Sequence, residues 1–293
     1  MDEGRDLLLT TMESNHWEPA EGSHAWLDRM TLDPRFGNLG AATTFGAFLV
    51  AANGENLAGL STLYRWETGL NLPHYAVARS FVEYASDAWW VLSPGAIFEE
   101  ELELDPSLAH MTEEEALATS NMRLARAMLL HAEDLRQHRI AIEERHGAGS
   151  EAAQSATHRY ETQRSLLSEW SGQKLEGKPI DWVISGERLG TYTDRVSSMI
   201  QRFWPDVRSP VYRIFSNYTH ANAVTLLHAT TITDHDGHLH YNWLPDYVEL
   251  ERLARMVLFV WERTAQALLA MYGYSSGAMD AWRLKIDMLV PDA

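Results

Sequence analysis

Long stretches of helical apolar spacing, each bounded by a start or stop signal, constrain the fold of this chain more than any other feature. The clearest stretch begins at Thr112, which Glu115 follows in the pattern of an N-terminal capping box, and it ends at the glycine-rich sequence 146–149. A second helix is expected over 150–170. Two long helices with so short a break between them predict an antiparallel helical hairpin at 112–170.

Other helices follow from similar signals. One is expected over 72–92, between a Leu-Pro start and a Ser-Pro-Gly stop, and a long apolar one over about 246–272. A helix over 41–65 is expected to be interrupted near Gly54, because glycine weakens a helix interior. Further helices are expected at 187–203, 210–221 and 279–289.

One region carries a strand signal instead. Residues 230–233 and 238–241 are rich in β-branched and aromatic side chains and flank an Asp-His-Asp-Gly turn, which predicts a β-hairpin. Together these patterns predict an all-α fold, an antiparallel helical bundle with one small β-hairpin near 230–242.

The domain organisation is inferred from where the helical periodicity of apolar residues is clear and where it is absent. Residues 1–38 mix acids, Gly, Pro and isolated aromatics, so we interpret them as an N-terminal arm with one short helix near 24–30. Residues 39–293 are interpreted as a single helical domain, from which the hairpin at 112–170 extends as a second arm.

The composition restricts the possible functions. The 293 residues include 41 Asp and Glu against 24 Lys and Arg, and a net charge of −17 repels nucleic acid, so DNA binding is not expected. Because there is no cysteine, disulfides, iron–sulfur clusters and thiolate zinc sites are excluded, and we expect no cofactor. The N-terminal region has no signal-peptide pattern, and no apolar run approaches the roughly 20 residues of a bilayer span. We therefore expect a cytoplasmic protein without a membrane partner.

The helix predicted at 210–221 is the most informative short segment. Helical spacing places Tyr212, Ser216 and His220 in one polar column, because each lies four residues from the next. Their side chains can converge on a ligand, with His220 as a general acid or base near neutral pH. Alternatively, the column only satisfies neighbouring polar groups. Two further candidates lie beside this column: Asn217, which can bind the ligand, and Arg213, which can neutralise its charge.

A second polar strip lies in the helix predicted at 72–92. Arg79, Glu83 and Asp87 share one helical face among apolar neighbours, and buried charges are costly unless they are paired or bind a ligand. In one interpretation Arg79 binds an anionic group while Glu83 holds it in place. In the other, a structural Arg–Glu pair ties this helix to another.

The two strips together, at 79–83 and 212–220, resemble bacterial all-helical families grouped with the HEPN-like domains, over about residues 40–270. In HEPN ribonucleases, an Arg and a His separated by four to six residues meet across a dimer interface and cleave RNA without a metal. The resemblance therefore implies Arg213 and His220, with six residues between them, as catalytic residues. The residue after this Arg is usually polar in the family and is Ile in this chain.

The leading interpretation is a HEPN-like homodimer that binds a nucleotide-like or other small anionic ligand, or RNA, between the helices at 72–92 and 210–221. Metal-independent RNA cleavage is its sharper form. One alternative is a non-catalytic helical binding or regulatory module. Another is a metal-dependent enzyme that uses the histidines of 228–240, since His238 and His240 would share one strand face. The residues that we expect to bind the ligand are Arg79, Glu83, Tyr212, Ser216 and Asn217; the other histidines of the metal alternative are His228 and His235.

Overall fold

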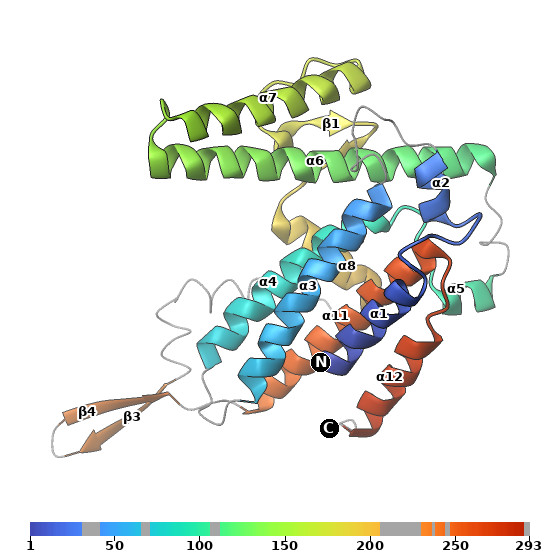
Figure 1. Ribbon diagram of the computed structural model, residues 1–293. Helices are drawn as coiled ribbons and strands as arrows, with labels where there is room; N and C mark the ends of the chain where they lie inside the picture. The colour runs from blue at the N-terminus through green and yellow to red at the C-terminus, as the bar shows by residue number, and fades with distance from the viewer. Residues whose placement is uncertain are drawn as a thin grey trace.

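Three long helices form the centre of the molecule (Figure 1). They are α3 (Ala42–Tyr64), α4 (Asn71–Leu92) and α11 (Tyr247–Tyr272), and each packs against the other two. The structure, a computed structural model, describes residues 1–30, 42–65, 71–105, 112–205, 230–235, 238–243 and 247–289.

Shorter helices cover this centre. α1 (Asp2–Ser14) and α12 (Gly277–Leu289) contact each other and α11, while α8 (Tyr192–Phe203) packs on α4. α5 (Glu99–Leu104) is joined to α8 by an ion pair between Glu101 and Arg202. The largest fully buried apolar side chains of this bundle are Leu8, Met12, Leu57, Leu60, Phe81, Leu92 and Trp261.

Residues 2–14 belong to the bundle, so the expectation of an irregular N-terminal arm is wrong there. Leu8 and Met12 are one turn apart on α1, and both are almost completely buried in the core. Gly4 lies directly against the Trp282 ring of α12. This narrow apolar stripe among acidic residues was too short to produce a visible period. The short helix expected at 24–30 is confirmed as α2 (His24–Met30).

α3 continues through Gly54, so the predicted interruption is wrong. A Cβ on Gly54 would lie 3.2 Å from Cγ of Arg5 in α1 and 3.6 Å from the Trp261 ring in α11. The glycine therefore lets α1 and α11 approach α3 closely, and packing offsets its low helix propensity.

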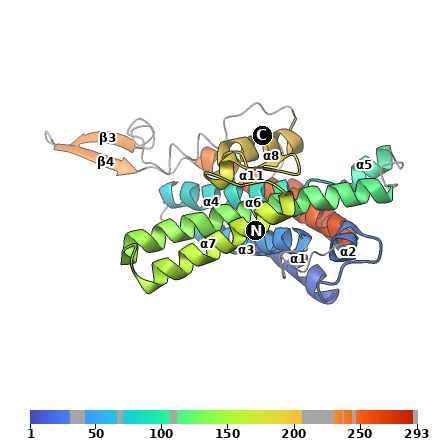
Figure 2. The same ribbon diagram turned by 90° about the horizontal axis from the view of Figure 1, so that it is seen from above.

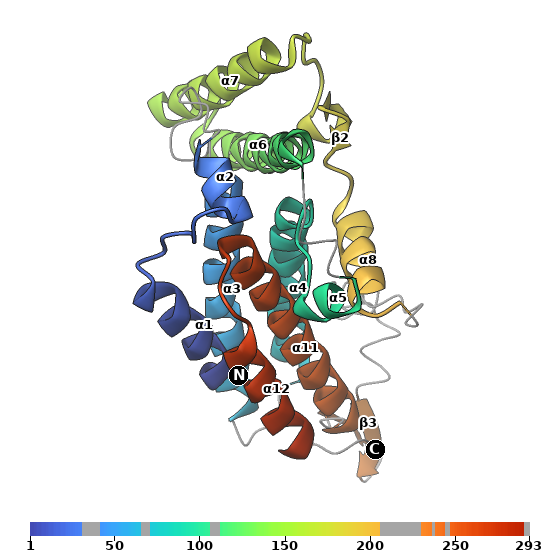
Figure 3. The same ribbon diagram turned by 90° about the vertical axis from the view of Figure 1, so that its right-hand side faces the viewer.

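The predicted helical hairpin consists of α6 (Glu113–His146) and α7 (Glu151–Ser171), which lie side by side. α6 crosses the ends of α3 and α4, as Figures 2 and 3 show from two further directions. The Thr112–Glu115 capping box is present. A completely buried ion pair between Arg123 and Asp28, 2.5 Å long, ties α6 to α2.

Two small antiparallel sheets complete the described structure. β3 (Thr230–His235) and β4 (His238–Trp243) form the predicted hairpin, which projects away from the bundle (Figure 1). β1 (Val183–Ile184) and β2 (Glu187–Arg188) form a second hairpin after a short 3-10 turn, η3 (Pro179–Asp181). The helix expected over 187–203 therefore begins later, at Tyr192.

The all-α fold with a small β-hairpin is confirmed. In the parts of the chain that the structure describes, no helix is both long enough and apolar enough to cross a membrane.

Candidate functional site

The first two members of the polar strip on α4 contact each other as a pair. Nε of Arg79 donates to Oε1 of Glu83 at 2.8 Å, and their side chains are 19% and 21% exposed. The two residues lie one turn apart, so the pair joins two turns of one helix. The structural and the ligand-binding interpretations of this pair both stay predictions.

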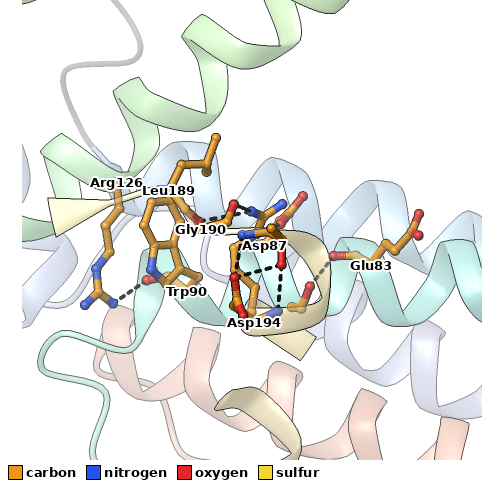
Figure 4. A network of polar contacts seen from close by, with 10 residues as sticks. Glu83, Asp87, Trp90, Arg126, Leu189, Gly190 and Asp194 are labelled. Carbon is orange, nitrogen blue, oxygen red and sulfur yellow. Dashed lines mark hydrogen bonds and ion pairs between the residues drawn. The ribbon is translucent and has the colours of Figure 1, made fainter. Parts of the chain in front are cut away.

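Asp87, one turn further along α4, ties this helix to α8. Nε of Arg195 in α8 donates to Oδ1 of Asp87 at 2.6 Å, and both residues are buried (Figure 4). Nη1 of Arg195 also donates to the backbone carbonyls of Leu189 at 3.1 Å and Gly190 at 2.9 Å. Arg195 therefore fixes the start of α8 against α4. We call Arg79, Glu83, Asp87 and Arg195 the α4 strip.

The local sequence explains why α8 starts where it can meet α4. Thr191 caps α8, because its hydroxyl accepts from the backbone N–H of Asp194 at 3.2 Å. The Asp194 carboxylate accepts from the Thr191 backbone N–H at 2.9 Å and from the Thr191 hydroxyl at 2.7 Å, and these two hydrogen bonds lower the pKa of Asp194. The capping box sets the helix start one turn before Arg195.

A further carboxyl group, that of Asp134 in α6, acts on Asp87 of the α4 strip. Burial raises the pKa of Asp87 to about 6; Arg195 opposes this rise, and Asp134 of α6 and Glu83 add to it. Partial burial, with Glu133 beside it, raises the pKa of Asp134 to about 6 as well. Both carboxyls are therefore less acidic than an ordinary aspartate.

Aromatic rings border the site. The guanidinium carbon of Arg195 lies 4.4 Å from the centre of the Tyr192 ring and 6.0 Å from that of Trp90. Burial raises the pKa of the Tyr192 phenol to about 12, so this hydroxyl stays protonated near neutral pH. Tyr192 as a whole is 43% exposed, so a ligand can reach part of the residue.

A second arginine holds the side of the site nearest α6. Nη1 of Arg126 donates to the Trp90 carbonyl at 2.7 Å (Figure 4). The same nitrogen donates to the Ser93 hydroxyl at 2.7 Å, and Nε donates to Glu187 of β2 at 2.6 Å. The Arg126 guanidinium also lies 5.4 Å from the Trp90 ring centre. α4, α6 and the β1–β2 hairpin are therefore fixed relative to one another.

The other predicted site residues lie outside the described part of the chain. These residues are Tyr212, Arg213, Ser216, Asn217 and His220, and their meeting with Arg79 and Glu83 stays a prediction.

The backbone register of the β3–β4 hairpin places His235 opposite His238 and Thr233 opposite His240. Within the described ranges, no three His, Asp or Glu side chains come together in a way that could hold a metal. His228 lies outside these ranges, so the metal-dependent alternative also stays a prediction.

Arg195, Asp134 and Tyr192 were not identified from the sequence. A signal for Arg195 does exist, because it lies on the buried face of α8 with Val196, Met199, Ile200 and Phe203. A charged residue on an apolar helix face needs a buried partner of opposite charge. On α4, Arg79 can pair with Glu83, which leaves Asp87 as an acid that needs a basic partner from another helix. Nothing local in the sequence marks Asp134 among the many charges of α6.

Comparison of the chain with protein-family models, with curated proteins and with solved structures gave no match. The resemblance to HEPN-like domains therefore stays a prediction that depends on the short motifs alone.

Proposed function

We propose that this protein binds a small anionic ligand of nucleotide-like chemistry at the α4 strip. The observation that carries the proposal is the fixed guanidinium of Arg79, which Glu83 holds at 2.8 Å on a partly exposed face of α4. A guanidinium whose direction is already set loses less side-chain entropy when it binds a phosphate or carboxylate. Its planar group also matches the geometry of these anions.

The other charges of the site favour a nucleotide over a simple anion. Glu83 pairs with Arg79, and Asp87 and Asp134 lie near Arg195, so the negative charge of these three acids opposes an inorganic phosphate ion. A nucleotide offers a phosphate to Arg79, while its hydroxyl and amino groups can donate to the carboxylates. The partly exposed Tyr192 provides a ring on which a base can stack.

RNA cleavage by a HEPN-like homodimer is the finer form of the proposal. It is supported by the spacing of Arg213 and His220, whose side chains would neutralise charge and transfer a proton. A fluorescent single-stranded RNA incubated with the protein in EDTA tests it. Cleavage by the wild type and its loss in His220→Ala are expected, and intact RNA with both proteins would contradict this form.

Ligand binding itself is tested by calorimetric titration with AMP and with inorganic phosphate. We expect AMP to bind more tightly than phosphate, and Arg79→Gln to weaken AMP binding about tenfold, because a hydrogen bond to a charged group is lost. The matched control is Arg255→Gln, which removes the same charge from another Arg–Glu pair one turn apart, with Glu251 on α11. This variant should bind AMP like the wild type.

Two outcomes would overturn the proposal. One is equal AMP affinity in Arg79→Gln and the wild type. The other is the absence of measurable heat with either probe up to millimolar concentration while circular dichroism shows a folded helical protein.

A further inference from the structure

A pocket of about 340 Å³ lies on the face of the bundle formed by α3, the loop after α1, α2 and the end of α11. On α3, Ala47 and Ala51 are one turn apart, and their small side chains leave the space open. Three aromatic residues line it: Trp17, Phe48 and Tyr272. Phe48 is 62% exposed, so its ring is accessible to a ligand in the pocket.

The wall that carries Trp17 is fixed by the last residue of α11 and by Tyr274 just after it. The backbone N–H of Ala20 donates to the carbonyl of Tyr272 at 2.9 Å, and the Tyr274 hydroxyl donates to the carbonyl of Glu18. These contacts hold the backbone of Trp17 at a φ of 55° and that of the preceding residue at 53°. Both angles lie in the left-handed region, which residues other than glycine rarely adopt. Such strain persists only where surrounding contacts determine the conformation. The pocket is therefore formed before any ligand arrives.

Two polar side chains at the pocket matter for binding, one a charged guanidinium and the other a neutral phenol. Arg29 of α2 donates from Nη2 to the Trp17 carbonyl at 3.0 Å and pairs with the exposed Glu18, and its guanidinium has further N–H donors. The Tyr272 hydroxyl is hydrogen-bonded to Thr44, and burial raises its pKa, so it stays neutral. The pocket thus combines an apolar lining with a single positive charge at its edge.

We propose that this pocket binds a hydrophobic monocarboxylate. The aromatic lining receives the apolar body of the ligand, and Arg29 binds the carboxylate in place of Glu18, whose exposed pair contributes little stability. A cationic ligand is repelled by Arg29, and a doubly charged phosphate loses too much hydration against apolar walls. The volume falls at the low end of the roughly 300–1,000 Å³ typical of small-molecule sites. This site is separate from the α4 strip.

The test uses 3-phenylpropionate, octanoate and the neutral 3-phenylpropionamide in calorimetric titrations with the full chain. The wild type should bind at least one of the two carboxylates more tightly than the amide, and the tighter carboxylate shows whether the body is aromatic or aliphatic. Arg29→Gln should weaken carboxylate binding about tenfold and leave the amide unchanged. Ala51→Leu fills the pocket and should abolish binding of all three probes.

The charge control is Arg65→Gln, because Arg65 is 72% exposed and pairs with Asp2 away from the pocket. It should bind like the wild type, and AMP should not displace the carboxylates. Failure of both carboxylates to bind the folded wild type overturns the proposal, as does unchanged binding in Ala51→Leu. A change of sedimentation coefficient on Phe48→Ser, without carboxylate binding by the wild type, would instead identify this face as a contact between two copies and would also overturn it.

Discussion

Arg195→Met tests the physical basis of the α4 strip, because it removes a buried guanidinium and keeps most of the apolar stem. Arg195 is 6% exposed, holds Asp87 at 2.6 Å and donates to the carbonyls of Leu189 and Gly190. The substitution leaves a buried carboxylate and two carbonyl groups without these donors.

The expected cost is about 3–5 kcal/mol, the loss typical when one partner of a buried ion pair is removed. Leaving a buried carbonyl without a donor costs about 1–3 kcal/mol. For the Leu189 and Gly190 carbonyls we expect the lower end of this range, because the loop before α8 can shift toward water. A loss of this size is a large share of the about 5–15 kcal/mol that stabilises an ordinary domain.

The loss should also depend on pH. The pKa of Asp87 is about 6 with Arg195 present and rises further without it, against an ordinary value of 3.8. A carboxyl whose pKa is raised on folding destabilises the folded state progressively as pH rises from the unfolded pKa to the folded pKa, and the loss is constant above the folded pKa. Near pH 4 the carboxyl is protonated in the folded state of both the wild type and the variant, so only the loss of carbonyl partners separates them. The difference from the wild type should therefore grow above pH 6.

The assay is urea unfolding followed by far-ultraviolet circular dichroism and by tryptophan fluorescence, at pH 4, 6 and 8. Arg202→Met on the same helix is the matched control, because Arg202 is 44% exposed, and it should cost less than about 1 kcal/mol. Asp87→Leu combined with Arg195→Met should recover most of the loss. A cost below about 1 kcal/mol for Arg195→Met, or one that does not change with pH, would refute this reasoning.

Three further outcomes are expected in the same unfolding assay. Asp134→Asn should stabilise the protein by less than about 1 kcal/mol above pH 6 and have no effect below pH 4, because the pKa of Asp134 is raised to about 6; destabilisation at pH 8 would contradict this. Gly172→Ala should lose about 1–2 kcal/mol of stability, because Gly172 has a φ of +64° and an added Cβ would face open space. Gly273→Ala should lose more, because Gly273 has a φ of +73° and also packs against the loop before α2. Equal losses in the two variants would show that close packing at Gly273 has no role. Thr112→Ala should cost about 1 kcal/mol through its capping box, and an unchanged midpoint would count against that cap.

Helix boundaries were predictable wherever a side chain or a glycine marks them. Thr112 with Glu115 starts α6, and Gly273 ends α11, because these residues act on backbone groups within one turn. The β1–β2 hairpin was missed although its turn, Ser185–Gly186, is a dipeptide typical of turns, with φ of 50° and 79°. Its two strands are too short to show an alternating pattern.

Some features of the fold depend on packing between distant segments and could not be predicted from local sequence signals. Gly54 interrupts a helix in isolation, yet here it sits in the middle of α3 because two other helices approach it. The same applies to the candidate site. Helical spacing predicted that Arg79, Glu83 and Asp87 share a face, whereas the partner of Asp87 comes from α8, more than a hundred residues later. A contact over that sequence distance depends on how α8 packs on α4.

The central claim is that the α4 strip binds a nucleotide-like ligand, and photolabelling with 8-azido-AMP followed by peptide mass spectrometry tests it most directly. We predict labelled peptides from α4 or the start of α8 in the wild type, with labelling suppressed by excess AMP and reduced in Arg79→Gln but not in Arg255→Gln. Labelling confined to other helices, or labelling of α4 that excess AMP does not suppress, would contradict the claim.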